Sequence, residues 1–117
     1  MLSSKRALAL AAALVVSSSA LVATAADASA AAITGDYVAG GTYIRSGPHT
    51  GSTPLGLGYK GQGATFLCWT TGTGVHVPGG GTSYEWVKNR DQRTGVTGYS
   101  SDVYLIEHSS IANLKEC

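Results

Sequence analysis

One octet, Gly41-Thr42-Tyr43-Ile44-Arg45-Ser46-Gly47-Pro48, sets the class of structure that we expect for the whole chain. Thr, Tyr and Ile favour a pleated surface, whereas Ser-Gly-Pro cannot continue one, so the octet predicts a short strand that ends abruptly in a turn. Arg45 lies at the junction, where its fork of donors can bind loop carbonyls or a carboxylate. A β domain therefore starts here with a strand and a tight turn.

Further short strands follow the octet at close intervals. The strongest covers residues 64–69, and weaker ones are expected over 55–59, 84–89, 96–99 and 104–106. A period of two gives the strongest strand two faces, with Ala64, Phe66 and Cys68 on one and Thr65, Leu67 and Trp69 on the other. We therefore predict an all-β fold of five to six short strands, as a small barrel or a paired-sheet roll.

The glycine content also supports an all-β fold. All sixteen glycines lie between Gly35 and Gly98, which favours many tight turns and disfavours helices. They are dense between Thr70 and Ser83, so we expect an exposed, mobile loop in that segment.

Residues 1–30 are typical of a signal peptide that is removed after export. A positively charged start precedes an uncharged apolar run, and small residues with two A-x-A motifs follow, so we favour cleavage after Ala30. An uncleaved membrane helix would need about 20 apolar residues, and serines interrupt the run before that length. We then expect an N-terminal arm over residues 31–40, a barrel with a C-terminal tail over residues 41–117, and a secreted, monomeric product.

Charge and cysteine content narrow the possible partners. Without residues 1–30 the chain keeps six basic and six acidic residues, so it offers no basic block for nucleic acid or for an anionic membrane. Cys68 and Cys117 are the only cysteines, and in an exported chain we expect them to form a disulfide that closes the C-terminal tail onto a strand. A catalytic thiol and an intermolecular bridge are the alternatives.

Catalytic and metal-binding patterns are absent from the sequence. His49, His76 and His108 fall in segments expected to be turn, loop or tail, and none has the spacing of a zinc motif. No Gly-x-Ser-x-Gly nucleophile elbow occurs. We expect neither an enzyme nor a cofactor or metal site.

Aromatic residues are too many for a core of this size. Tyr and Trp combine a rigid apolar body with one polar group, which suits a peptide or sugar groove. We expect Trp86 and Tyr99 to fill the barrel. The side chains that we expect to form an exposed ligand-binding platform are Trp69, Tyr84, Tyr43 and Tyr104.

The chain resembles the bacterial SH3 domain family. In that family a short strand ends in Asn-Val-Arg-Ser-Gly-Pro or a close variant, which Arg45-Ser46-Gly47-Pro48 match directly. Later matches in order and spacing are Lys60-Gly61, the strand from Ala64 to Cys68, Trp86, Gly98-Tyr99, Ser100-Ser101-Asp102 and Tyr104-Leu105. The late cysteine is similar to secreted actinobacterial versions. Ser100 departs from the usual apolar residue, and the glycine-rich loop is longer than the family pattern.

The resemblance implies a non-catalytic binding module. Bacterial SH3 domains often accompany cell-wall hydrolases and are thought to bind the peptide part of peptidoglycan, so we expect peptidoglycan as the partner here. The alternative is a secreted interaction protein or inhibitor that acts on another exported protein through the glycine-rich loop at residues 72–83.

Overall fold

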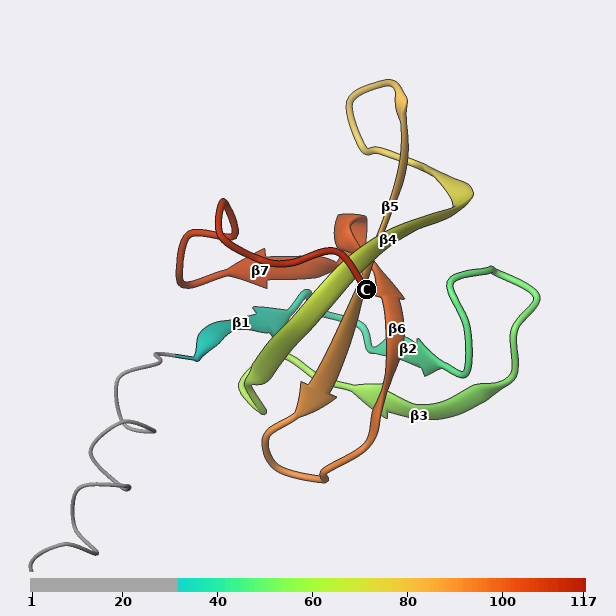
Figure 1. Cartoon of the computed structure of the whole chain (residues 1–117). Helices are drawn as coiled ribbons and strands as arrows, with labels where there is room; N and C mark the ends of the chain where they lie inside the picture. Colours follow the sequence, from blue (N-terminus) through green and yellow to red (C-terminus); the bar gives the residue numbers. More distant parts are fainter. Residues whose placement is uncertain (1–31) are drawn as a thin grey trace, which may run out of the picture. The chain divides into compact units, whose positions relative to one another are not determined.

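The computed structural model describes residues 32–117, and all of its long elements are β-strands (Figure 1). In chain order these elements are β1 (Ile33–Tyr37), β2 (Thr42–Arg45), β3 (Pro54–Gly58), β4 (Ala64–His76), β5 (Thr82–Asp91), β6 (Thr97–Ser101), the 3-10 turn η1 (Asp102–Tyr104) and β7 (Leu105–Glu107). Within residues 32–117, no helix is long and apolar enough to span a membrane. The signal peptide predicted at residues 1–30 and its cleavage site lie outside the described residues.

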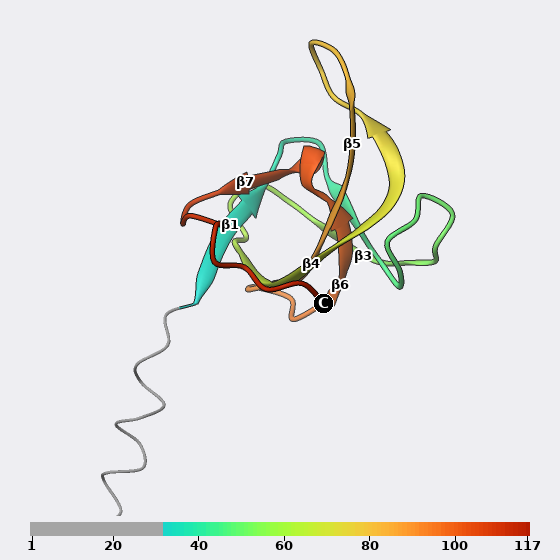
Figure 2. The ribbon, with the colours of Figure 1, turned by 45° about the horizontal axis from the view of Figure 1, so that its top comes forward.

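The seven strands form one antiparallel sheet that curls into a barrel. Their order is β3-β2-β6-β5-β4-β1-β7, so β1 and β3 are far apart along the hydrogen-bonded sheet. They nevertheless meet in space, because a Cβ added at Gly58 of β3 would lie 2.5 Å from the ring of Tyr37 in β1. Figure 2 shows the ribbon curling round on itself. The prediction of a small all-β barrel is confirmed, with seven strands in place of five to six.

A buried carboxylate holds the turn between β3 and β4 against β1. Asp36 of β1 accepts hydrogen bonds from the backbone N–H groups of Gly61 and Gly63, which follow β3. Burial by itself raises the pKa of Asp36, but the N–H groups of Gly61, Tyr37 and Gly63 together outweigh it and hold the pKa below its usual value. The carboxylate thus stays charged and fixes the β3–β4 turn at the end of the ladder between β1 and β4.

The core lies between the walls of this barrel. Its buried members are Tyr37, Ile44, Ala64, Phe66, Val87 and Leu114. The Tyr37 hydroxyl donates a 2.8 Å hydrogen bond to Oδ1 of Asn89, so the one polar group of this ring is satisfied inside the barrel. Burial, and then the nearby carboxylates of Asp91 and Asp36, raises the pKa of Tyr37 and keeps the phenol protonated.

Ser100 is a buried polar residue whose hydroxyl group finds a partner within the chain. It is buried in β6, and its Oγ donates a 2.8 Å hydrogen bond to the carbonyl oxygen of Tyr43 in β2. The backbone register between these two strands consists of a single pair, Arg45 with Tyr99. The serine therefore adds a second link between β2 and β6.

Two segments differ from the sequence-based expectation. Residues 31–40 were expected as an arm, yet Ile33–Tyr37 is a strand that pairs with both β4 and β7. The glycine-rich segment was expected as a mobile loop, yet β4 continues to His76 and β5 begins at Thr82, which leaves only residues 77–81 as a turn. Thr71, Thr73 and Val75 alternate with two glycines, so the high glycine content concealed a period of two.

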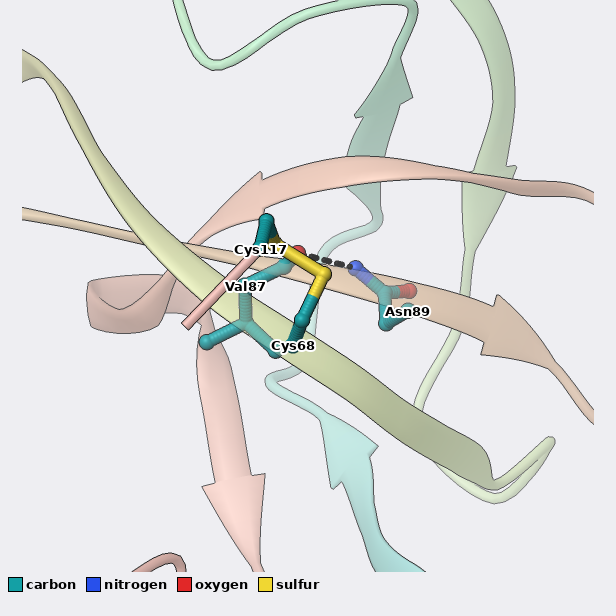
Figure 3. Close-up of a disulfide and its surroundings, with 4 residues drawn as sticks. All are labelled: Cys68, Val87, Asn89 and Cys117. Atoms are coloured by element: carbon teal, nitrogen blue, oxygen red, sulfur yellow. Dashed lines mark hydrogen bonds between the residues drawn. A yellow bond between two sulfur atoms is a disulfide. The ribbon is translucent and has the colours of Figure 1, made fainter. Parts of the chain in front are cut away.

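The C-terminal tail is fixed to β4. Cys68 and Cys117 form a disulfide with their Cα atoms 4.9 Å apart, and Figure 3 draws it beside Val87 and Asn89. Trp69 N–H donates to the Lys115 carbonyl and Trp69 O accepts from Cys117 N–H, so Glu116 forms a single parallel bridge with Trp69 of β4.

The predicted internal disulfide is therefore confirmed, and neither a free thiol nor an intermolecular bridge is present in the described chain. A bond of this type fits an oxidising compartment.

Candidate ligand-binding pocket

Strand β5 has an inner and an outer face. Val87 and Asn89 point into the barrel and are buried. Because successive side chains of a strand alternate between faces, Trp86 and Lys88 belong to the outer face. Trp86 is nonetheless only 2% exposed, and it lies outside the core cluster. Something other than the core must cover this indole.

The loop between β2 and β3, residues 46–53, provides that cover. Thr73 of β4 donates its N–H to the Pro48 carbonyl at 3.2 Å, and its own carbonyl accepts a 2.8 Å hydrogen bond from Trp86 Nε1. A Cβ at Gly72 would overlap the Pro48 carbonyl oxygen, so only glycine permits this close approach. The loop, β4 and the indole are therefore held as one unit.

A pocket of about 430 Å³ lies beside Trp86 on this outer face. Its size falls in the range of small-ligand sites. The lining comes from β2, the β2–β3 loop, the β4–β5 hairpin and the region of η1, and its members are Gly41, Thr42, Tyr43, Arg45, Thr50, Gly74, Val75, Trp86, Ser101 and Tyr104. Segments distant in the sequence thus build one site.

Tyr43 and Tyr104 are the exposed aromatic members of this lining. Tyr43 is 51% exposed and Tyr104 is 45% exposed, whereas the Trp86 indole beside them is almost completely covered. The backbone near Tyr104 is fixed, because its carbonyl accepts hydrogen bonds from Val38 N–H and from the Thr42 hydroxyl. A rigid backbone that presents open aromatic surface favours binding with little loss of conformational entropy.

Arg45 is the one charged residue of the lining. Its guanidinium lies 4.7 Å from the centroid of the Tyr43 ring, within cation–π distance, and NH1 donates a 2.9 Å hydrogen bond to the Ser52 carbonyl. Of the two kinds of partner expected for Arg45 from the sequence, loop carbonyls or a carboxylate, the structure shows a loop carbonyl. The side chain is thereby held at the edge of the pocket, with Tyr43 on one side and the β2–β3 loop on another.

The four predicted platform residues separate in space. Tyr43 and Tyr104 line the pocket. Tyr84 is exposed on the outer face of β5, and its ring adjoins the lining residue Gly74, where an added Cβ would lie 2.8 Å from it. Trp69 lies elsewhere, half-buried against the core.

A register shift explains the position of Trp69. The ladder between β4 and β5 is irregular between Phe66 and Cys68, so the simple alternation of the strand breaks there. After the irregularity Trp69 pairs with Val87, which is a core residue. The sequence-based assignment of Trp69 to the same outward face as Leu67 did not include such a bulge.

Sequence reasoning missed Trp86 and Arg45 as pocket residues. Trp86 was expected to fill the barrel; it is buried, but on the outer face. The sequence contained a signal for this position, because Tyr84, Trp86 and Lys88 are spaced two residues apart and therefore share one face of the strand, on which Tyr84 is exposed. Tyr99, also expected inside, pairs with Lys88 and lies 5.9 Å from its Nζ, which places it on the outer face as well.

Groups suited to hydrolysis or metal binding do not gather in this pocket. His49 lies near it, with Nδ1 3.3 Å from the Thr73 hydroxyl, but it is exposed. In residues 32–117, no three His, Cys, Asp or Glu side chains come together in a way that could hold a metal ion. The lining offers aromatic surface, hydroxyl groups and one cation, which are groups that bind a ligand.

Comparisons of this chain with protein-family models, with curated proteins and with solved structures found no match.

Proposed function

We propose that the protein is a secreted, non-catalytic binding module whose outer pocket takes a short peptide, with the peptide part of peptidoglycan as its ligand class. The observation that carries the proposal is the pocket formed by Tyr43, Trp86 and Tyr104 on a disulfide-bonded barrel. The sequence resemblance to bacterial SH3 domains and the apparent signal peptide support it independently.

The chemistry of the lining favours a peptide over a sugar. Carboxylate and amide side chains can form paired hydrogen bonds with adjacent sugar hydroxyls, and none of the lining residues is Asp, Glu, Asn or Gln. The hydroxyl groups of Thr42, Thr50 and Ser101 offer only single contacts. Planar amides and aliphatic side chains can instead pack on the tyrosine rings, while the hydroxyl groups of Tyr43 and Tyr104 remain at the solvent edge. An extended peptide of two or three residues suits a pocket of this size.

Co-sedimentation with purified cell-wall sacculi tests the proposal. The exported, oxidised protein should pellet saturably, and Tyr43→Ala and Tyr104→Ala should each weaken pelleting about tenfold, because truncating an aromatic anchor typically costs 1–2 kcal/mol or more. Leu55→Ala is the control, since Leu55 is as exposed as Tyr43, at 51%, but lies outside the lining. A protein that stays in the supernatant with sacculi of several wall types would refute wall binding.

The β4–β5 hairpin favours one second candidate, an interaction with another exported protein. Its tip projects from the barrel in both views (Figures 1 and 2), and Gly79, Gly80 and Gly81 there have positive φ with open space around them. Replacing residues 77–81 by a two-residue Asn-Gly turn should leave sacculus binding unchanged if the pocket is the site. Loss of an inhibitory or partner-binding activity in that variant would support the hairpin instead.

A further inference from the structure

Arg45 is held in a way that prepares it for an anion. A guanidinium has five N–H donors, and the hydrogen bond to Ser52 O uses one of them. The Tyr43 ring, 4.7 Å away, limits the rotation of the group and leaves its edge at the pocket. A planar fork that is already positioned loses little entropy when it binds a planar carboxylate.

No residue of the pocket lining can supply that carboxylate. The lining contains neither Asp nor Glu, and the adjacent loop over residues 46–53 contains none either. The acidic residue nearest in sequence to the lining residue Tyr104 is Asp102, and its Oδ1 accepts a hydrogen bond from the Ser83 hydroxyl at 2.6 Å. Arg45 therefore lacks an acidic neighbour among the described residues that build the pocket.

A second cation strengthens the positive field of this face. Tyr99 of β6 pairs with Arg45 on one side and with Lys88 on the other, so the three residues form a row across adjacent strands. With strands about 4.8 Å apart, the two cationic residues start roughly 10 Å from each other. Lys88 Nζ lies 5.9 Å from the Tyr99 ring centroid. A chain with a formal net charge of only +1 thus places two cations on the face that carries the pocket.

We infer that the pocket selects peptides by a free carboxylate that binds the Arg45 guanidinium, while the neighbouring peptide unit packs on the exposed rings of Tyr43 and Tyr104. This inference rests on the proposed function and specifies the charge of its ligand. A bidentate carboxylate would use donors that the Ser52 carbonyl leaves open, in a site where aromatic walls reduce competition from water. Wall peptides can supply such a carboxylate from the C-terminus or from a D-glutamate residue.

Four synthetic pentapeptides test the inference and separate the two sources. The sequence is Ala-γ-D-Glu-Lys-D-Ala-D-Ala, with the C-terminus free or amidated and the glutamate α-carboxyl free or amidated. Binding to the full, oxidised protein is followed by calorimetry. Blocking the carboxylate that Arg45 recognises should weaken binding about tenfold or more, because hydrogen bonds to charged groups are worth 1.5–3 kcal/mol. Blocking the other should change little.

Substitutions of Arg45, with a control at Arg93, test whether the guanidinium is the group that recognises the carboxylate. In Arg45→Gln, the free and blocked peptides should bind with equal affinity, and Arg45→Lys should recover part of the difference. Arg93→Gln removes an exposed cation in the β5–β6 turn and should behave as the wild type. The peptide series in the wild-type protein needs no substitution, so it stands even if Arg45→Gln proves unstable.

The outcomes distinguish this inference from the proposal beneath it. If the wild-type protein binds all four peptides equally, carboxylate selection is wrong while peptide binding stands. If the protein pellets with sacculi but binds none of the peptides, carboxylate selection is again wrong, and the wall ligand is of another kind. If it binds neither sacculi nor peptides, the proposed function itself fails.

Discussion

Two tyrosines that are close in sequence, Tyr37 and Tyr43, lie in contrasting surroundings. Tyr37 is completely buried, its hydroxyl is bonded to Asn89, and its ring packs on a glycine across the barrel. Tyr43 is about half exposed, and its ring contacts Arg45 at the edge of an open pocket. The inner region, which is the barrel core around Tyr37, satisfies its polar groups within the chain. The outer region, which is the pocket beside Tyr43, presents groups that a ligand can satisfy. The difference separates what stabilises this fold from what it can bind.

The largest effect should come from the disulfide, which stabilises the fold by fastening the C-terminal tail to β4 and is not part of the pocket lining. Cys68 and Cys117 are separated by 49 residues, and closing a loop of that length stabilises the fold by about 4 kcal/mol in the chain-entropy model. The double variant Cys68→Ser/Cys117→Ser should lose about that much in chemical denaturation, and reduced wild-type protein should match it. A loss below about 1 kcal/mol would show that the hydrogen bonds of the tail suffice without the disulfide.

Gly72→Ala should affect both regions at once. The added Cβ would overlap the Pro48 carbonyl oxygen, so the β2–β3 loop must move away from Trp86. We expect a cost of about 1–3 kcal/mol, as for other overpacked sites, and at least tenfold weaker sacculus binding. Gly51→Ala, in the same loop but with open space around the position, is the control and should change neither property. Unchanged binding in Gly72→Ala would mean that the docked loop is not needed for the site.

The two tyrosines themselves provide a matched pair of hydroxyl deletions. Tyr37→Phe leaves Oδ1 of the buried Asn89 without its donor and should cost about 1–2 kcal/mol of unfolding free energy. Tyr43→Phe removes an exposed hydroxyl and should stay within about 0.5 kcal/mol of the wild type. Thermal and urea unfolding measure both. Equal effects would show that the contrast between the two sites is not energetic.

The smallest effect is a change in pH dependence. The pKa of Asp36 lies below its ordinary 3.8 in the folded chain, so its contribution to stability is present above about pH 4 and is lost as the pH falls through the folded pKa. Asp36→Asn should therefore flatten the acid limb of a melting-temperature profile.

Glu85 provides a control, because its pKa is shifted in the opposite direction from that of Asp36. Burial, followed by Asp102 and Glu107, raises its pKa, so its ionised form opposes folding at neutral pH. Glu85→Gln should raise the melting temperature at pH 7 slightly and leave the Asp36 effect in place. An acid limb in Asp36→Asn as steep as in the wild type would contradict the role of Asp36.

Local signals in the sequence predicted much of the inner region. Alternating apolar residues in β4, the Ser-Gly-Pro turn after Arg45 and the cysteine pair all specify structure within a few residues or through a single bond. The strand β1 was missed, because Ile33–Tyr37 contains a glycine and an aspartate whose roles appear only in contacts with segments distant in the sequence. Contacts between distant segments supply the remaining information.

The pocket was only partly predictable for the same reason. Tyr43 and Tyr104 were selected as exposed aromatics, and both line it. The position of Trp69 depended on a register shift, and the cover over Trp86 depended on a loop that docks at Gly72. Neither feature has a local sequence signal strong enough to read without the structure. Outer sites of this kind require the tertiary arrangement.

The two tryptophans allow the most direct test of the central claim that the pocket beside Trp86 is the binding site. Each indole N–H gives its own signal in a nitrogen–proton NMR spectrum, so Trp69 serves as an internal control within the unmodified protein. Soluble peptidoglycan fragments should shift the Trp86 signal saturably, together with the backbone amides of Tyr43 and Tyr104, and leave Trp69 in place. A titration that moves Trp69 and leaves Trp86 unchanged would contradict the account.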